Sequence, residues 1–323
     1  MNYENEKYLT TPDKLRETVE QYGVGIIPNV LNETEIKDMQ NGAWDYFEHI
    51  TQNFEIPIVR DNEESWKGFY SLYPKHSMLH QHFKIGHAQY IWDIRQNEKV
   101  INTFSQFWGN DNNELFTSFD GASFHIPPEK TKRGWFRKLW LHCDQSFKRN
   151  DFECLQSWVT AYDIDEGDGT LVFLEGSNNY HKEFAERHEI SCKGEWYKLE
   201  SDDEYDFYTK EKQCEKTFIK CKAGSMVFWD SRTIHCGVEP HKGREIPKIR
   251  NVVYLCMTPK NMSSSRTNIK RIKAFNDLRM TTHSPHKCLL FPKNPRTYGG
   301  PIPEVVSIEK PELTPLGKSL VGI

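Results

Sequence analysis

One short segment, LWLHCDQS, places two metal-binding side chains two residues apart: His142 and Asp144 flank a single cysteine. On an extended strand, side chains two residues apart point to the same face, so both would reach one space. Further along, the apolar segment GSMVFW is followed by a turn and then by His235. Two imidazoles and one carboxylate on a rigid β framework can form the facial ligand set of a non-haem Fe(II) centre, which leaves other coordination positions open for O2 and a co-substrate.

The H-x-D spacing is common by itself, and the alternative is a histidine whose ring bonds a backbone carbonyl within a sheet. Arg250 adds a second indication, because it opens an apolar run soon after His235. A planar guanidinium at the mouth of a barrel is suited to bidentate binding of a carboxylate. The alternative for Arg250 is a surface or interface ion pair.

The sequence around these residues predicts an all-β core with helical additions, that is, an α+β fold. From residue 115 onward, short runs rich in β-branched and aromatic residues are separated by turn signals such as Asp120-Gly121 and Ala223-Gly224. This pattern of short strands and turns predicts a jelly roll or a related double-sheet barrel. The expected strands cover residues 115–119, 122–126, 139–142, 155–162, 170–174, 217–220, 225–229 and 251–257.

Helical signals dominate on either side of this core. Residues 14–22 predict an amphipathic helix that ends at Gly23, and a strand follows over 24–27. Asn32 stands three residues before Glu35, which predicts a capping box and a helix to about His49. The apolar spacing over 77–108 is mostly helical, and a further helix is expected near 269–278. The acidic run 202–206 is expected to be a solvated turn.

We therefore expect a single catalytic domain over residues 1–323. Its parts are a mainly helical N-terminal shoulder, the β core with an inserted segment, and a C-terminal extension. Their boundaries are 1–114 for the shoulder, 115–259 for the core, 177–215 for the insertion and 260–323 for the extension.

Several segments together resemble the phytanoyl-CoA dioxygenase-like family of Fe(II)/2-oxoglutarate-dependent oxygenases. They occur in consistent order from about Tyr22 to Pro259: YGVGIIPNVLNETEI, IGHAQYIWDIR, FTSFDGASF, WLHCDQS, GDGTLVFLEGSNNYH and GSMVFWDSRTIHCG. The resemblance implies a double-stranded β-helix of the jelly-roll or cupin type. It also implies Fe(II), 2-oxoglutarate as co-substrate, and O2. His142, Asp144 and His235 match the family's iron ligands residue by residue.

The implied activity is hydroxylation of an unidentified substrate, expected to be a small molecule, with succinate and CO2 as co-products. Asp144 supports hydroxylation, because halogenating relatives lack this carboxylate. The family arginine usually follows the distal histidine more closely than Arg250 does, so Arg244 is a rival for the 2-oxoglutarate carboxylate. We favour Arg250, because its place at the start of a strand fixes the direction of its side chain. The turn EGSNN replaces the usual Pro-Gly-Ser-His, which leaves the substrate pocket undefined.

Other residues near the motif have two interpretations each. Trp158 and Trp229 could wall the site or simply pack in the core. Four polar residues could contact ligands or substrate, although ordinary strand and turn roles are the alternative: Ser118, Asp120, Gln145 and Ser146. His80 and His82, in a histidine-rich stretch that also contains His87, would face different ways on a helix, which argues against a joint metal site.

The composition argues against several other classes of protein. The 42 Lys and Arg against 46 Asp and Glu give a formal net charge of -4, so no overall basic field draws the chain to nucleic acid or a membrane. No apolar run reaches the length of a membrane span, and the N-terminus has no signal-peptide pattern. With eight scattered cysteines and no C-x-x-C pair, these features predict a cytoplasmic protein with reduced thiols.

Basic segments support an alternative of a different class. The loop 130–138 is rich in Lys and Arg and contains aromatic residues, and the segment 260–273 is a second basic patch. Such a loop could let a non-catalytic jelly-roll module bind phosphate or nucleic acid. A nucleic acid or protein substrate and the oligomeric state also stay open at this level.

Overall fold

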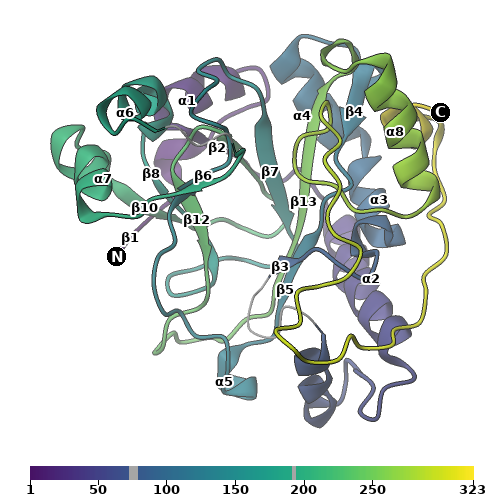
Figure 1. Cartoon of the computed structure of the whole chain (residues 1–323). Helices are drawn as coiled ribbons and strands as arrows, with labels where there is room; N and C mark the ends of the chain where they lie inside the picture. The colour runs from purple at the N-terminus through teal and green to yellow at the C-terminus, as the bar shows by residue number, and fades with distance from the viewer. Residues whose placement is uncertain (73–78, 191–193) are drawn as a thin grey trace.

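The computed structural model describes residues 1–72, 79–190 and 194–323. Two β-sheets form the centre of the molecule, and helices lie beside each of them (Figure 1). In Figure 1, α2, α3 and α8 lie beside the sheet that contains β5 and β13, whereas α6 and α7 lie beside the sheet that contains β8 and β10. The double-sheet core with helical additions confirms the predicted fold class.

The first sheet carries the short strands around the H-x-D segment. Its order is β1 (Asn2–Glu4), β10 (Lys216–Ile219), β8 (Thr170–Leu174), β12 (His235–Val238), β6 (His142–Cys143) and β9 (Tyr197–Lys198). Neighbouring strands are antiparallel except for the parallel pair β1–β10.

The second sheet is the more extensive one, and its strand pairs are antiparallel. Its order is β2 (Val24–Ile27), β11 (Met226–Asp230), β7 (Leu155–Thr160), β13 (Arg250–Pro259), β5 (Ala122–His125) and β3 (Leu79–His80), and β4 (Leu115–Thr117) also pairs with β13. Every residue of β2, β7 and β11 is buried, because helices cover the face that turns away from the first sheet.

Nine α-helices occur in the described part of the chain. They are α1 (Leu15–Tyr22), α2 (Glu33–Thr51), α3 (Gln89–Arg95), α4 (Glu98–Trp108), α5 (Pro128–Thr131), α6 (His181–Arg187), α7 (Asp202–Asp206), α8 (Ser265–Asn276) and α9 (Pro315–Val321). Short 3-10 segments cover Glu6–Tyr8, Glu63–Ser71, Ile85–His87, Asn112–Glu114, Ser177–Tyr180 and Lys260–Met262, and a π-helical turn covers Phe207–Glu211. None of the described helices is long and apolar enough to cross a membrane.

Local sequence signals explain where the N-terminal elements begin and end. Helix α2 starts at the predicted capping box: Asn32 accepts from the Glu35 backbone, and the Glu35 carboxylate accepts from the Asn32 backbone. Helix α1 ends at Gly23, whose φ of +81° is a left-handed conformation that glycine adopts without strain. The chain then enters β2, which has the predicted bounds.

Four expectations need correction. The strand predicted over 139–142 begins only at His142, because β6 is a two-residue strand with brief pairing to β12 and β9. Strand β12 was not predicted, since it is a short segment that starts with the polar His235. The acidic run 202–206 is helix α7, capped by Ser201, rather than a turn. His80 lies in strand β3 instead of a helix. The start of the helical stretch predicted from residue 77 lies outside the described residues.

Apolar side chains from both sheets pack together in part of the space between them. Trp158 and Val227 of the second sheet belong to one buried cluster with Leu171 and Phe173 of the first. Burial of such side chains is the main stabilising contribution, about 1.5–3 kcal/mol for a fully buried large apolar residue. The seven described cysteines, all buried, form no disulfide, and Cys192 lies outside the described residues.

Candidate metal centre

The three residues of the motif come together where strands β6 and β12 pair. The antiparallel register places His235 directly opposite His142, and their ring centroids are 4.4 Å apart. Asp144 follows β6 at a bend, and its two carboxylate oxygens lie 3.6 Å from His142 Nε2 and 3.5 Å from His235 Nε2. The candidate ligand atoms all lie within 4.8 Å of one another, which is compact enough for one metal ion.

Backbone carbonyls fix the orientation of both imidazoles. His142 Nδ1 lies 3.2 Å from the carbonyl oxygen of Trp140, and His235 Nδ1 lies 2.8 Å from that of Thr233. A carbonyl only accepts, so each Nδ1 carries the proton and each Nε2 presents its lone pair to the site. The donor set is therefore two neutral imidazole nitrogens and one carboxylate, which suits Fe(II) or a similar divalent cation.

The surroundings favour these protonation states. Burial lowers the pKa of His142 and the nearby His235 lowers it further, against the opposing effect of Asp144. Burial alone would raise the pKa of Asp144, but its interactions with the neighbouring His142, His283 and His235 hold that pKa well below its ordinary value. Gln156 of β7 also donates to Asp144 Oδ2 at 3.1 Å and so orients the carboxylate.

A cavity of about 500 Å³ opens beside this cluster. Both sheets contribute to it, and six large aromatic side chains line it: Trp140, Trp158, Trp196, Trp229, Tyr254 and Phe291. Trp140 stacks on His142, with a centroid distance of 4.5 Å and an interplanar angle of 8°, while its indole N–H donates to the Gly237 carbonyl. The cavity is thus large enough for a small organic molecule and apolar over much of its wall.

Arg250 and Arg244 occupy different surroundings. Arg250 starts β13 and lines the cavity, with one nitrogen donating to Ser123 Oγ at 3.1 Å and Nη1 donating to the Gly169 carbonyl at 2.6 Å. No described residue accepts a hydrogen bond from its Nη2. Arg244, by contrast, donates through all three of its nitrogens to two carboxylates, those of Glu129 and Asp168.

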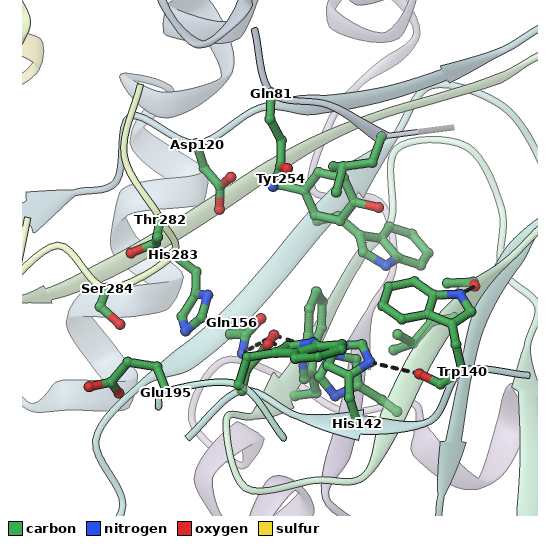
Figure 2. Close-up of a pocket in the computed structure, with 18 of the residues that line it drawn as sticks. Gln81, Asp120, Trp140, His142, Gln156, Glu195, Tyr254, Thr282, His283 and Ser284 are labelled. Atoms are coloured by element: carbon green, nitrogen blue, oxygen red, sulfur yellow. Dashed lines mark hydrogen bonds and ion pairs between the residues drawn. The ribbon is translucent and has the colours of Figure 1, made fainter. Parts of the chain in front are cut away.

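The C-terminal extension supplies part of the cavity wall that the sequence analysis did not foresee. Thr282, His283 and Ser284 line the cavity, as do Leu289 and Phe291. Figure 2 shows the first three on the side opposite Trp140. Pro285 within this histidine-rich stretch, TTHSPH, was the available signal for an ordered non-helical turn.

The same wall carries two further polar groups, Gln81 and Asp120 (Figure 2). Burial raises the pKa of Asp120, and this effect is opposed by His283, by the Gly121 N–H and by Arg95. Asp120 Oδ1 accepts from the Gly121 backbone at 2.8 Å. Glu195, from the inserted segment, completes the wall and forms ion pairs with Arg149 and Lys287.

Of the other candidate residues, some line the cavity and some do not. Trp158 and Trp229 line the cavity and are also buried in the core. Ser118 Oγ accepts a hydrogen bond from the Cys256 backbone. The Gln145 side chain accepts from the Ser231 hydroxyl and donates to the backbone carbonyls of residues 149 and 151. Ser146 accepts weakly from the Lys148 backbone. These last three therefore stabilise local chain geometry rather than line the cavity.

The basic segments and the histidines at positions 80, 82 and 87 are not among the residues that line the cavity. Within loop 130–138, Lys130 pairs with Glu63 and the Arg133 guanidinium lies 4.2 Å from the centre of the Tyr70 ring. In the second basic patch, Arg271 is fully buried and donates to backbone carbonyls. The rings of His80 and His87 each contact a backbone carbonyl.

Comparison with known sequences places the chain in a family. The model of the phytanoyl-CoA dioxygenase family matches residues 19–240, which is more than half of the chain, and the chain belongs to that family. The Ava biosynthesis cluster protein O of Aspergillus versicolor is 24% identical over 242 residues, covering 73% of this chain and 75% of that protein.

Solved structures show that the fold is shared more widely. A hypothetical protein of Escherichia coli aligns with a TM-score of 0.60 and 15% identity, covering 98% of this chain and 85% of the other. A proposed oxidoreductase from Salmonella typhimurium LT2 aligns with a TM-score of 0.59 and 15% identity, covering 96% and 82%. At this level of identity the likeness concerns the fold.

Proposed function

We propose that this protein is an Fe(II)/2-oxoglutarate-dependent dioxygenase that hydroxylates a small-molecule substrate and releases succinate and CO2. The observation that carries the proposal is the ligand triad of His142, Asp144 and His235, with both histidine tautomers set for metal binding, beside a cavity of about 500 Å³. Membership of the phytanoyl-CoA dioxygenase family supports the same chemistry.

In this proposal His142 and His235 bind iron through Nε2, and Asp144 binds through its carboxylate. Iron bound there supplies the site at which O2 is activated together with oxidation of 2-oxoglutarate. The chain's own contribution is to hold three ligands on one side and leave the opposite side to the cavity. Gln156 keeps the carboxylate turned toward the two imidazoles.

Arg250 is the residue we assign to the 2-oxoglutarate carboxylate. It lines the cavity, two of its nitrogens are already oriented by Ser123 and Gly169, and its Nη2 has no acceptor among the described residues. A guanidinium held in this way binds a carboxylate at little further entropic cost. Arg244 is a poorer choice, since binding 2-oxoglutarate would require it to leave Glu129 and Asp168.

We also propose that residues 1–323 act as one catalytic domain. The β core, the insertion and the C-terminal extension each contribute to the cavity lining, through Trp158, Trp196 and His283 for example. A cavity walled by all three parts excludes water from the metal only when all three are in place.

The test is succinate release from 2-oxoglutarate after anaerobic loading with Fe(II) and exposure to air. The intact chain is compared with His142→Ala and with His49→Ala, a control at an exposed histidine on α2. Succinate that depends on His142 but not on His49 supports the proposal. Absence of both succinate and Fe(II)-dependent binding of 2-oxoglutarate would overturn it and favour the non-catalytic binding module.

A further inference from the structure

We propose that the prime substrate is an amine: a molecule with an apolar body and a protonated nitrogen that binds Asp120 in the cavity wall. This inference rests on the proposed function, because it takes the cavity beside His142, Asp144 and His235 to be the substrate site. It concerns a different wall of that cavity, one that the metal ligands and Arg250 do not form.

The first step is the state of Asp120. This side chain is 7% exposed, yet it lines the cavity, and Figure 2 shows its carboxylate directed toward the space in front of His283. One oxygen accepts from the Gly121 N–H, and no described residue donates to the other oxygen. This oxygen lines the cavity, so a donor group of a bound molecule can reach it in place of water.

The second step is the charge behind Asp120. Arg95 is fully buried and donates to the backbone carbonyl of Asp120 at 2.7 Å, so it does not occupy the carboxylate. Burial raises the pKa of the Asp120 carboxyl, whereas His283, the Gly121 N–H and Arg95 act in the opposite direction and favour the ionised form. An ionised carboxylate accepts hydrogen bonds and donates none, which selects a ligand with N–H or O–H groups and disfavours a ligand carboxylate or phosphate.

The third step is the distribution of charge over the cavity. Among the described lining residues Arg250 carries the one permanent positive charge, and the proposed function assigns it to 2-oxoglutarate. Glu195 adds no net charge, because Arg149 and Lys287 pair with it, and Glu239 is a further lining carboxylate. The cavity therefore has no cation left for the phosphates of a CoA thioester, whereas Asp120 is available for a cation.

The fourth step is the aromatic lining. Trp140, Trp196 and Tyr254 present rings to the same space, and Trp196 is half exposed at 50%. Aromatic faces stabilise an ammonium group and pack against an apolar body. Gln81, Thr282 and Ser284 add neutral hydrogen-bonding groups beside Asp120. The combination fits an aryl or alkyl amine better than a neutral or acidic molecule of the same size.

The experiment is isothermal titration calorimetry of the whole chain loaded with Mn(II) and 2-oxoglutarate, which prevents turnover and occupies Arg250. Three probes share one apolar body: 4-phenylbutylamine, 4-phenylbutan-1-ol and 4-phenylbutyrate. We expect the amine to bind at least about tenfold more tightly than the alcohol, and the carboxylate to bind most weakly. Equal or tighter binding of the alcohol or the carboxylate would overturn the proposal, and so would the absence of binding by all three.

A variant tests whether Asp120 is the residue responsible. Asp120→Asn keeps an oxygen that can accept from Gly121 and removes the charge. We expect it to lower the affinity for the amine about tenfold and to change that for the alcohol less than about twofold. Asp277→Asn, at a partly exposed carboxylate that pairs with Lys273, is the matched control. A preference for the amine that survives in Asp120→Asn contradicts the assignment, and the comparison of probes on the unaltered chain does not depend on this variant's folding.

The same titration separates the two proposals. Binding of 2-oxoglutarate to the Mn(II)-loaded chain is measured before any probe is added. If 2-oxoglutarate does not bind, the proposed function fails. If it binds and the amine is not preferred, the proposed function stands and only the substrate class is wrong.

Discussion

The cavity has two walls of different construction. On the metal side, His142, His235 and Arg250 lie on paired strands, so backbone register fixes where each side chain points. On the opposite side, Thr282 and His283 belong to an irregular segment that is anchored by the isolated bridge between Thr281 and Leu290 and by the Cys154 thiol, which donates to the His283 carbonyl. Regular structure thus places the two histidine ligands, with Asp144 at the bend directly after β6, while irregular structure shapes the space for a substrate.

Two histidines of the same cavity provide the strongest test of this difference. His235→Ala removes a candidate ligand from the strand framework, and we expect the affinity for Mn(II) to fall more than about 100-fold. His283→Ala removes an imidazole from the irregular wall, and we expect the same affinity to change less than about threefold. Calorimetric titration of Mn(II) into each variant measures both. Equal losses would show that the two walls do not divide the roles in this way.

The two arginines provide the next test. Arg250→Ala should raise the KM for 2-oxoglutarate by about 10- to 100-fold, because a charge-assisted hydrogen bond contributes about 1.5–3 kcal/mol. The free energy of unfolding should fall by about 1–2 kcal/mol, because Ser123 Oγ and the Gly169 carbonyl lose their donor.

Arg244→Ala should behave in the opposite way. It leaves Asp168 and Glu129 without their partner, at positions where the Arg244 and Asp168 side chains are only 2% and 8% exposed. We expect the free energy of unfolding to fall by about 3 kcal/mol with little change in the KM for 2-oxoglutarate. Denaturant unfolding and steady-state kinetics on both variants decide the matter, and the reverse pattern would transfer the co-substrate role to Arg244.

Substitution of Gln156 tests how strongly its hydrogen bond orients the Asp144 carboxylate. Gln156→Leu keeps a similar volume but removes the donor to Asp144 Oδ2. We expect roughly tenfold weaker Mn(II) binding, because residues that orient a metal ligand typically contribute 10- to 100-fold in affinity. Gln156→Glu also lacks the amide donor and adds a negative charge beside Asp144, so comparison of the two variants separates lost orientation from added charge. Unchanged affinity in Gln156→Leu would mean that the two imidazoles alone orient Asp144.

Sequence patterns predicted the metal side of the cavity well. The H-x-D spacing and the later histidine were visible because alternation along a strand is a local property, and strand pairing then brings the two strands together. The capping box at Asn32 and the glycine stop at Gly23 were equally local, and the structure has both. Even so, the strand around His142 was predicted too long, because its pairing depends on tertiary neighbours.

The irregular wall could not be predicted in the same way. His283 lies about 140 residues from His142 in sequence, in a segment without helical or strand periodicity. Asp120 was considered as a possible contact, but its orientation depends on the Gly121 turn and on Arg95, which comes from helix α3. The choice between Arg250 and Arg244 likewise depends on where Glu129 and Asp168 lie, which is a property of the folded chain.

Trp140 is the position where we expect the smallest effect. Its substitutions separate two contributions to the metal side of the cavity, the hydrogen bond of the indole and the stacking of its ring on His142. Trp140→Phe keeps an aromatic ring against His142 but removes the hydrogen bond to the Gly237 carbonyl. The free energy of unfolding should fall by about 1 kcal/mol, the usual value of one such bond, and Mn(II) affinity should change less than about threefold. Trp140→Ala also removes the stacked ring, which frees the His142 imidazole to rotate, so a further loss of Mn(II) affinity in that variant would measure what stacking contributes. If Phe and Ala give the same affinity, the carbonyl of Trp140 at His142 Nδ1 is sufficient to orient this ligand.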